Sequence, residues 1–311
     1  MKRWIGAVWL TVGLAVSEGG VVAPDVVETF RVATYNLENY IEAPVGTRPA
    51  KSAASKSKIR ESIRSMSPDV LAVQEIGGMS ALCELASSLK AEGLDYPHSE
   101  LVTGHDTNVF VAVLSRFPIT ARRPHTNENF LLQGRRFQSS RGFAEVDIQV
   151  NPRYSFTLIA AHLKSRRLTP SADEADIREQ EAILLREKID ARLAGHPDAN
   201  LVVVGDLNDT KDTRSVRAVM GRGRSALVDA RPAERNGDSE PSPNPRFEPR
   251  TITWTHYFGK EDSYERIDYI LMSRGMAREW DAGGTWVAAL PNWGTGSDHR
   301  PVVATFYGAD R

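Results

Sequence analysis

The chain has 311 residues, which is long for one domain but within the range of a single large domain. Hydrophobic residues make up 41% and charged residues 25% of the sequence, values typical of a soluble globular protein that exclude a disordered or collagen-like chain. The formal net charge of −1 gives no support to nonspecific polyanion binding. A local basic strip would still permit a nucleic-acid partner.

The first seventeen residues have the pattern of an export signal. Lys2 and Arg3 precede an apolar block over 4–16 that is too short to span a bilayer comfortably. Ala15 and Ser17 are the small residues that a signal peptidase requires, so we expect cleavage after Ser17. The expected organisation is a signal peptide (1–17), a short linker (18–29) and one domain (30–308) in a secreted or periplasmic protein. An uncleaved membrane anchor is the alternative.

The number of cysteines limits which disulfides and metal sites are possible. Cys83 is the only cysteine, so an internal disulfide and a cysteine-based zinc site are both excluded.

Strands and helices alternate in the first part of the chain. Residues 30–36 carry the β-branched and aromatic content of a strand, and 59–66 show apolar residues at helical spacing. A strand over 70–73, a helix near 82–89 and a strand over 108–115 follow.

The second half adds a hairpin, a long helix and a closing group of strands. Alternation over 144–150 leads through a turn into an apolar strand over 156–162, and 171–193 reads as a long helix. A buried strand over 201–204 and a short helix near 216–220 come next. Residues 231–249 contain five prolines and predict a surface loop near the substrate. The tail predicts strands over 251–257, 267–272 and 301–307.

The strand over 201–204 runs directly into polar residues. Its apolar run predicts burial on both faces, and Gly205 would let the chain leave the sheet. If the extended geometry persists, Asp206 and Asn208 project to the same side at the carboxyl end of the strand, where ligand groups are often placed. An Asx-type turn is the alternative for this pair.

Polar side chains also stand at the ends of other strand-like segments along the chain. Six strand-like segments end in, or are flanked by, a side chain that can bind metal or phosphate: Asn36, Glu75, His162, Asp206 with Asn208, Asp268, and Asp298 with His299. Each has an ordinary structural explanation when taken alone, as a turn former, a solvated strand end or a core histidine. Together they predict one site. His256 belongs to no motif; near Tyr257 it could line the cleft, but a packed or surface histidine is the simpler interpretation.

These segments resemble the motifs of the endonuclease/exonuclease/phosphatase superfamily, the metal-dependent phosphoesterases that include deoxyribonuclease I, exonuclease III and the sphingomyelinases. The similar words occur in the family's order: Thr34-Tyr35-Asn36-Leu37, Val73-Gln74-Glu75, Ala161-His162-Leu163, Gly205-Asp206-Leu207-Asn208, Arg266-Ile267-Asp268-Tyr269 and Ser297-Asp298-His299-Arg300-Pro301. The resemblance implies an α+β fold, a four-layer α/β/β/α sandwich of two mixed β-sheets flanked by helices. The strands predicted from periodicity agree with that arrangement.

Phosphoester hydrolysis explains the residue types. A phosphodiester is anionic, so a cation must offset the repulsion of the attacking oxygen, and Mg²⁺ prefers one or two carboxylates plus waters. Glu75 is the first expected ligand of Mg²⁺ (or Mn²⁺ or Ca²⁺), assisted by Asn36 and, by the resemblance, Asp298. The resemblance assigns the catalytic roles as follows: Asp206 orients or deprotonates water, Asn208 holds a phosphate oxygen, His162 and His299 donate to the phosphate, and Asp268 orients His299.

Basic residues near these motifs are candidates for substrate contacts. Arg135 and Arg141 offer forked guanidinium contacts to phosphate. Lys164, Arg166 and Arg167 follow His162 and are placed to meet more of a polyanionic substrate. A solvated basic hairpin and a plain surface loop are the respective alternatives. The chain departs from many nucleases of the family at Ala160, where they carry an asparagine.

The sequence therefore predicts a Mg²⁺-dependent phosphoester hydrolase, a nuclease or other phosphodiesterase that acts by in-line attack of water. A sphingomyelinase-like enzyme or a small-molecule phosphatase is the alternative within the class. A catalytically silent module that binds a phosphorylated ligand is the alternative of another class, and the intact motif set argues against it. The expected partner is nucleic acid or another phosphodiester substrate; no stable protein partner is indicated, and we expect a monomer.

Overall fold

The structure is a computed structural model that describes residues 1, 28–235 and 253–311. The predicted signal peptide, most of the predicted linker and most of the predicted 231–249 loop lie outside these ranges. No helix in the described ranges combines the length and the apolar character that crossing a bilayer requires.

The first large sheet has seven strands in the order β12-β16-β17-β1-β2-β4-β3. β1 pairs parallel with β2 and antiparallel with β17, so the sheet is mixed. The strands are β1 (Thr29–Tyr40), β2 (Val70–Ile76), β3 (His98–Val102), β4 (Phe110–Ser115), β12 (Ala233–Glu234), β16 (Trp280–Val287) and β17 (Val302–Tyr307).

The second large sheet has six strands in the order β11-β15-β10-β9-β8-β5. β9 and β10 are parallel, whereas β15 runs antiparallel to β10. The strands are β5 (Ile119–His125), β8 (Phe143–Asn151), β9 (Tyr154–His162), β10 (Leu201–Asp206), β11 (Val228–Asp229) and β15 (Asp268–Met272). Two separate hairpins join β6 (Asn129–Leu132) to β7 (Arg135–Gln138) and β13 (His256–Phe258) to β14 (Ser263–Glu265).

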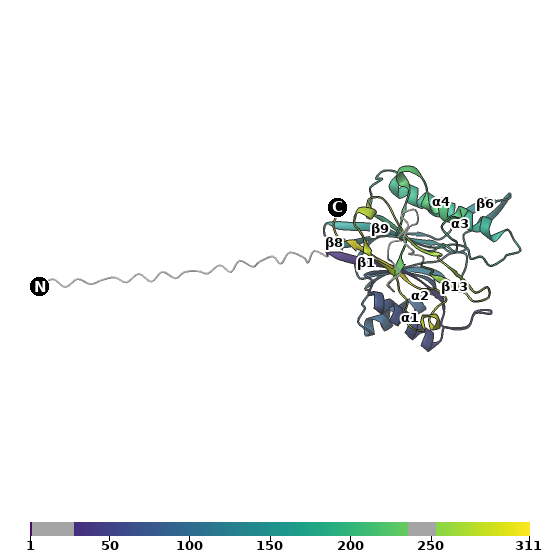
Figure 1. Ribbon diagram of the computed structural model, residues 1–311, viewed down its shortest axis with the longest axis horizontal. Helices are drawn as coiled ribbons and strands as arrows, with labels where there is room; N and C mark the ends of the chain where they lie inside the picture. The colour runs from purple at the N-terminus through teal and green to yellow at the C-terminus, as the bar shows by residue number, and fades with distance from the viewer. Residues whose placement is uncertain (2–27, 236–252) are drawn as a thin grey trace, which may run out of the picture.

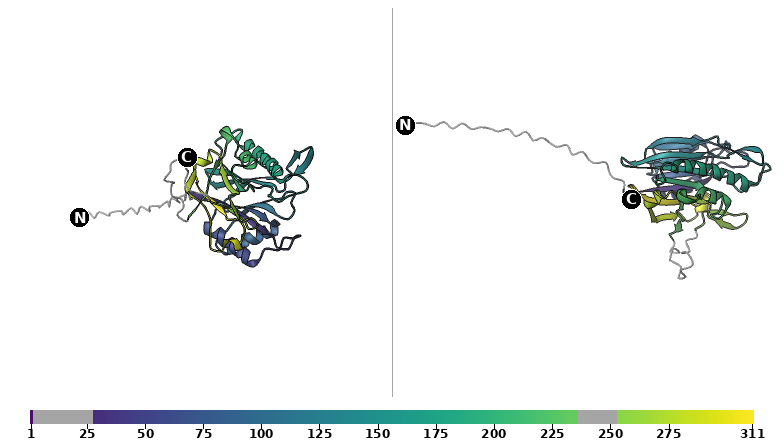
Figure 2. Two further views of the ribbon diagram at one scale, coloured as in Figure 1. Left: turned by 45° about the vertical axis from the view of Figure 1, so that its right-hand side comes forward. Right: turned by 90° about the horizontal axis from the view of Figure 1, so that it is seen from above.

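Four α-helices cover the outer faces of the two sheets. α1 (Ala53–Met66) and α2 (Gly78–Ala91) lie on one side of the molecule, and α3 (Glu174–Leu193) and α4 (Arg214–Met220) lie on the other (Figure 1). The left view of Figure 2 shows the same order of layers. Three short 3₁₀ turns, Gly223–Ser225, Met276–Arg278 and Trp293–Thr295, complete the described elements. The predicted four-layer α/β/β/α sandwich is confirmed.

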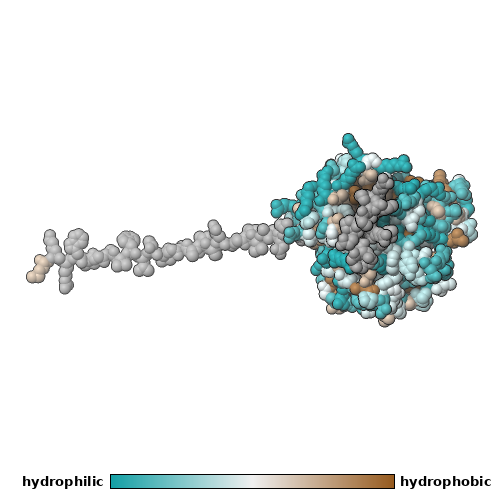
Figure 3. Space-filling view, viewed as in Figure 1, coloured by the Kyte–Doolittle hydropathy of each residue, from teal (hydrophilic) through white to brown (hydrophobic). Residues whose placement is uncertain are grey.

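The layers are held by three apolar clusters. One fills the space between the sheets, one lies between α1, α2 and the first sheet, and one lies between α3, α4 and the second sheet. β10 illustrates the principle: Val202 and Val204 face the other sheet, while Leu201 and Val203 face the helices. Because both faces are covered, the strand is apolar throughout, as predicted. The outer surface in Figure 3 is mainly hydrophilic, with scattered apolar patches.

The structure contains strands that the sequence pattern did not predict. β3 and β5 were not expected, and neither was β16, where Gly283 and Gly284 interrupt the pattern and the register with β17 shifts between Asp281 and Trp286. The β6–β7 hairpin carries Arg135 and corresponds to the solvated basic hairpin that was the alternative to a phosphate contact. The expected strand over 251–257 is wrong in extent, because within the described residues only His256 and Tyr257 of that range are in a strand.

Gly205 has a different role from the one predicted. It does not let the chain leave the sheet, because it pairs with Ala161 and Tyr269 inside the second sheet. Its φ of 137° and its position explain the glycine, since an added Cβ would lie 1.9 Å from the Ala161 carbonyl oxygen.

Candidate active site

Strand direction brings the predicted residues together. β1, β2, β9 and β10 end at one edge of the sandwich, and β15 and β17 begin at that edge because they run antiparallel to β10 and β1. In the register of the second sheet, Asp206 lies opposite His162 on one neighbour and Asp268 on the other. Residues far apart in the sequence therefore converge.

The backbone at this edge is irregular. Glu38, Asn39, Glu75 and Asn208 have φ between 49° and 62°, in the left-handed region that non-glycine residues seldom adopt. The β1–β2 register shifts between Asn36 and Tyr40, as it does at the end of β2 against β4. Such bulges re-aim side chains, and strained residues cluster at functional sites.

A cleft of about 690 Å³ opens at this edge. Seven of the eight residues predicted as catalytic or metal-binding line it: Asn36, Glu75, His162, Asp206, Asn208, Asp298 and His299. The eighth, Asp268, is buried behind His299. The volume is within the range of small-molecule sites.

The Oδ2 atom of Asp206 is the common neighbour of the central polar groups. It accepts a hydrogen bond of 2.9 Å from Asn36 Nδ2 and one of 3.3 Å from Asn208 Nδ2. The Nε2 atoms of His162 and His299 lie 3.4 and 3.8 Å from it. Burial, followed by the charge of Asp268, raises the pKa of Asp206 to about 6. A carboxylate with that pKa is suited to accept a proton near neutral pH.

Asn208 reaches the cleft through a turn. Its backbone N–H donates to Asp206 Oδ1 at 2.8 Å, which is the Asx-type turn of the alternative interpretation. Its left-handed φ rules out the extended geometry that the sequence suggested. The turn nevertheless keeps both side chains on the cleft, so the turn and a site role are compatible here.

His299 is held by Asp268. Its Nδ1 lies 2.9 Å from Asp268 Oδ2, and both side chains are nearly inaccessible to solvent. Burial alone would lower the pKa of His299, but the charge and hydrogen bond of Asp268 outweigh it and raise that pKa to about 10. At neutral pH His299 is therefore a cation that can donate from Nε2.

His162 has the opposite character. Burial, followed by the charge of Arg141, lowers its pKa well below the ordinary value, so the ring is neutral. Its Nδ1 is buried and has no hydrogen-bond partner among the described residues. A neutral ring carries one N–H, so His162 can donate one hydrogen bond to a substrate oxygen.

Carboxylates gather beside this group with little compensating charge. Glu75 Oε2 accepts from the Asn39 backbone N–H at 2.8 Å. Burial, then the charge of Asp298, raises the pKa of Glu38; Lys51 opposes the shift from 3.2 Å, and Glu75 adds to it. An accumulation of oxygen donors and negative charge fits a hard divalent cation such as Mg²⁺, with Glu75, Asp298 and Asn36 available to hold it.

Glu38 and His256 are among the cleft residues that the sequence motifs did not select. Glu38 stands in a polar stretch that was noticed only for Asn36, and His256 was given a packing or surface role with a place on the cleft as the alternative. The His256 ring lies against His299 with centroids 4.5 Å apart, and its Nε2 is 3.6 Å from Asp298 Oδ2. Partial burial would raise the pKa of Asp298, but the contact with His256 and the nearby imidazole charges outweigh it, so this pKa is lowered.

The three basic residues predicted to contact the substrate phosphate are not brought to the cleft lining. Arg135 is exposed on the β6–β7 hairpin and donates to the Ser171 carbonyl. Arg141 is buried 3.9 Å from Asp106. Lys164 Nζ donates to the carbonyls of Ser165 and Arg167. Arg166 and Arg167, which the sequence placed beside Lys164 as further substrate contacts, do line the cleft, and so does Lys260, which was not expected.

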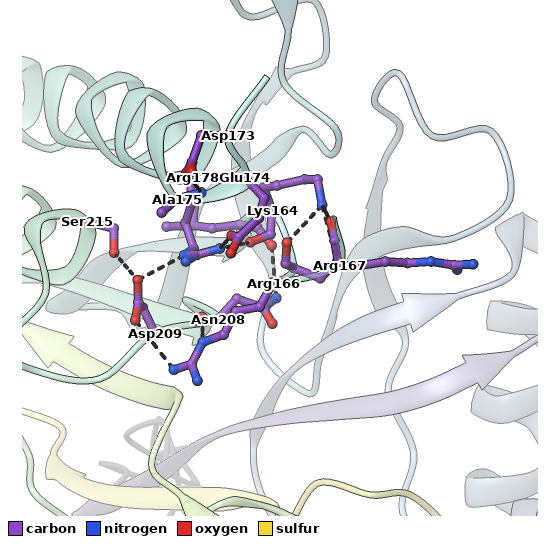
Figure 4. A network of polar contacts seen from close by, with 12 residues as sticks. Lys164, Arg166, Arg167, Asp173, Glu174, Ala175, Arg178, Asn208, Asp209 and Ser215 are labelled. Atoms are coloured by element: carbon purple, nitrogen blue, oxygen red, sulfur yellow. Dashed lines mark hydrogen bonds and ion pairs between the residues drawn. The ribbon is translucent and has the colours of Figure 1, made fainter. Parts of the chain in front are cut away.

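A buried ionic network holds the loop that carries Asn208 (Figure 4). Asp209 accepts hydrogen bonds of 2.9 Å from Arg178 Nε and 3.0 Å from Ser215 Oγ, and Arg166 lies 3.4 Å from its other oxygen. Arg178 also donates to the Lys164 carbonyl. The network ties α3 and α4 to the two loops that follow β9 and β10. In Figure 4 the Arg167 side chain points away from it.

The fold and the site define a class: a hydrolytic phosphoesterase built as a four-layer sandwich. The chain belongs to the Endonuclease/Exonuclease/phosphatase family, whose sequence profile matches residues 33–299. No curated protein matches the chain by sequence.

Solved structures show the same fold at low sequence identity. The catalytic domain of human nocturnin with bound sulfate is 17% identical, with a TM-score of 0.60 over 91% of this chain and 97% of that chain. Sphingomyelinase C from Streptomyces griseocarneus is 18% identical, with a TM-score of 0.58 over 89% and 99%. The 3′ phosphatase NExo from Neisseria, bound to a product DNA hairpin, is 16% identical, with a TM-score of 0.58 over 89% and 99%.

Proposed function

We propose that the protein is a Mg²⁺-dependent phosphodiesterase, most directly a nuclease, that hydrolyses its substrate by in-line attack of water without a covalent intermediate. The convergence of Asn36, Asn208, His162 and His299 on Asp206 Oδ2 carries the proposal. These groups supply a base and several donors around one point, as hydrolysis of an anionic ester requires.

The cation is assigned to the acidic side of the cleft. Glu75, Asp298 and Asn36 would hold Mg²⁺, which when bound offsets phosphate charge and stabilises the transition state as a Lewis acid. The position of Glu38, Glu75 and Asp298 on the same cleft supports this assignment, because carboxylate oxygens are ligands that Mg²⁺ prefers.

Protein groups would divide the remaining work. Asp206 takes the proton of the attacking water, and Asn208 holds a phosphate oxygen through its amide. His299, charged and oriented by Asp268, donates from Nε2 to a phosphate oxygen as negative charge develops. Neutral His162, whose Nε2 lies 3.4 Å from Asp206 Oδ2, donates a second hydrogen bond to the phosphate.

The basic residues on the cleft favour a polyanionic substrate. Arg166 and Arg167 extend from the loop after His162, and Lys260 lies on the opposite hairpin. Arg166 is held by Asp209 and Glu265, whereas the Arg167 side chain points away from that network and is the better placed to meet a second phosphate. A polynucleotide supplies such phosphates on either side of the scissile bond.

A lipid phosphodiester is the second candidate. The β13–β14 hairpin that walls the cleft exposes Phe258 and Tyr264, and exposed aromatic side chains near a cleft favour a lipid headgroup at an interface. The fold shared with a sphingomyelinase C is compatible with this candidate. Trp286 is buried and does not contribute to an aromatic surface patch.

A substrate panel tests the proposal. Plasmid DNA, RNA, sphingomyelin vesicles and phosphate monoesters are incubated with Mg²⁺, Mn²⁺ or Ca²⁺ supplied separately, comparing the wild type, Asp206→Asn and the exposed control Asp212→Asn. We expect DNA or RNA cleavage with Mg²⁺ that Asp206→Asn lacks and Asp212→Asn keeps. Hydrolysis of sphingomyelin alone would select the lipid candidate. Turnover of no substrate with any cation would favour a silent phospholigand-binding module.

A further inference from the structure

A second cluster of metal-binding atoms lies beside the proposed Mg²⁺ ligands. His256, Asp298 and His299 each offer one ligand atom, and these atoms all lie within 4.8 Å of one another. His256 comes from the β13–β14 hairpin, whereas Asp298 and His299 precede β17. All three line the cleft, so an ion can enter from solvent.

The backbone holds the two segments in register. His256 and His299 form an isolated antiparallel bridge, and the Tyr257 N–H donates to the Asp298 carbonyl at 3.0 Å. The imidazole rings lie at 41° with their centroids 4.5 Å apart. The three side chains are therefore placed by main-chain contacts and do not depend on a flexible loop.

The spacing is close to that of a bound transition metal. Two ligand atoms about 2.0–2.1 Å from a tetrahedral Zn²⁺ lie roughly 3.4 Å apart. Asp298 Oδ2 is 3.6 Å from His256 Nε2, and Asp298 Oδ1 is 3.8 Å from His299 Nε2. The two contacts use different oxygens of Asp298, and the three ligand atoms lie within 4.8 Å of one another, so side-chain rotation would have to draw them closer around a bound ion. The fourth position would face the cleft.

The environment of His299 matches that of a metal ligand. Its Nδ1 lies 2.9 Å from Asp268 Oδ2, the outer carboxylate contact that fixes the ring of a ligating histidine and directs its other nitrogen at the metal. The alternative group of Asp206, Asp268 and His299 is less suitable. Its two carboxylates are fully buried and already accept hydrogen bonds from Asn36 and His299.

The donor set indicates which ion would bind. Mg²⁺ prefers oxygen ligands, whereas two imidazoles with one carboxylate suit Zn²⁺, Co²⁺ and similar ions. We propose that His256, Asp298 and His299 form a zinc-type site that shares Asp298 with the Mg²⁺ position at Glu75, and that its occupation inhibits hydrolysis. Inhibition follows because the metal binds His299 Nε2 in place of its proton, which passes to the solvent, so this atom can no longer donate to the phosphate. The inhibition of hydrolysis rests on the proposed function, whereas the binding of the metal does not.

Titration calorimetry of the metal-stripped protein with Zn²⁺ tests binding independently of activity. We compare the wild type with His256→Gln and with His196→Gln, a matched change at an exposed histidine. One Zn²⁺ should bind to the wild type and to His196→Gln, and His256→Gln should weaken the affinity at least about tenfold. Co²⁺ should give the intense visible bands of a tetrahedral complex in the wild type and in His196→Gln, but not in His256→Gln. Equal Zn²⁺ affinity in all three proteins would overturn the site.

Activity then tests the second part. With Mg²⁺ saturating, micromolar Zn²⁺ should inhibit the wild type and His196→Gln, whereas His256→Gln should keep a clearly larger fraction of its own zinc-free rate. Zn²⁺ inhibition that is unchanged in His256→Gln would overturn the inhibitory role. A protein that turns over no substrate would refute the proposed function while the calorimetric result stands.

Discussion

His299 and Asp268 form a buried pair in which Nδ1 of the imidazole lies 2.9 Å from Oδ2 of the carboxylate. The pair joins the start of β15 in the second sheet to the segment that precedes β17 in the first sheet. It therefore crosses the interface between the two sheets at the edge where the cleft opens. This contact sets which nitrogen of His299 faces the cleft, because the other nitrogen is engaged.

Replacing Asp268 by Asn should reduce turnover more than metal affinity. The amide keeps the size of the side chain but removes the charge that stabilises the His299 cation, so we expect kcat to fall about 10²-fold or more. The Mg²⁺ concentration for half-maximal rate should change little. Steady-state kinetics with a Mg²⁺ titration measures both quantities, and Asp198→Asn, an exposed aspartate paired with Arg278, serves as the control. A variant that loses Mg²⁺ affinity and keeps kcat would contradict this orienting role.

Replacing Glu75 by Gln should have the complementary effect. Removing a carboxylate ligand should raise the Mg²⁺ concentration needed for half-maximal activity at least about tenfold. Glu61→Gln, at an exposed glutamate on α1, should leave it unchanged. An equal Mg²⁺ requirement in the wild type and Glu75→Gln would show that the cation is held elsewhere.

Part of the site could be predicted from the sequence. Asp206 and Glu75 end apolar runs that are typical of strands, and His299 precedes such a run. Once the order and direction of the strands are known, these strand ends can be placed at one edge of the sandwich. The family resemblance supplied that order, and the sandwich and the site lining agree with it. The Asp206–Asn208 geometry was only partly foreseen, because a left-handed turn depends on local backbone conformation.

Other features depend on contacts that no local pattern records. His256 reaches the cleft because its strand bridges to His299, more than forty residues later. Lys164 and Arg141 do not line the cleft: Lys164 donates to backbone carbonyls, and Arg141 is buried 3.9 Å from Asp106. β16 escaped prediction because its two adjacent glycines break the alternation of a strand, although it pairs with β17.

Gly205→Ala should destabilise the fold. The residue has a φ of 137°, and a Cβ would come within 1.9 Å of the Ala161 carbonyl oxygen, so β9 and β10 would have to separate. We expect the free energy of unfolding to fall by about 3 kcal/mol or more, from backbone strain and lost packing. Urea denaturation measures the change. Gly195→Ala is the control, because no atom lies within 4 Å of its added Cβ. Equal loss in both variants would contradict the close-approach explanation.

Stability should fall in acid through Glu145. This buried carboxylate accepts hydrogen bonds from Arg123 and His125. Burial would raise its pKa, but the contacts with His125 and Arg123 outweigh it and lower the pKa to about 2. Because the folded pKa lies below the unfolded value of about 4.3, its stabilisation is present above about pH 4.3 and is lost as the pH falls towards 2.

Thermal unfolding across the acid range measures this contribution. The wild type should exceed Glu145→Gln in Tm near neutral pH, and the difference should narrow as the pH falls below about 4. A Tm difference that is constant from neutral to strongly acidic pH would mean that the carboxylate charge does not stabilise the fold.

Hydrolysis of bis-p-nitrophenyl phosphate, with and without EDTA, tests the central proposal most directly when the wild type is compared with His299→Ala. The substrate carries one phosphodiester and no base or lipid, so it reports on the chemical site alone. We predict a Mg²⁺-dependent rate in the wild type that EDTA abolishes and that His299→Ala lowers about 10²-fold or more. Equal rates in the two proteins, unaffected by EDTA, would contradict it.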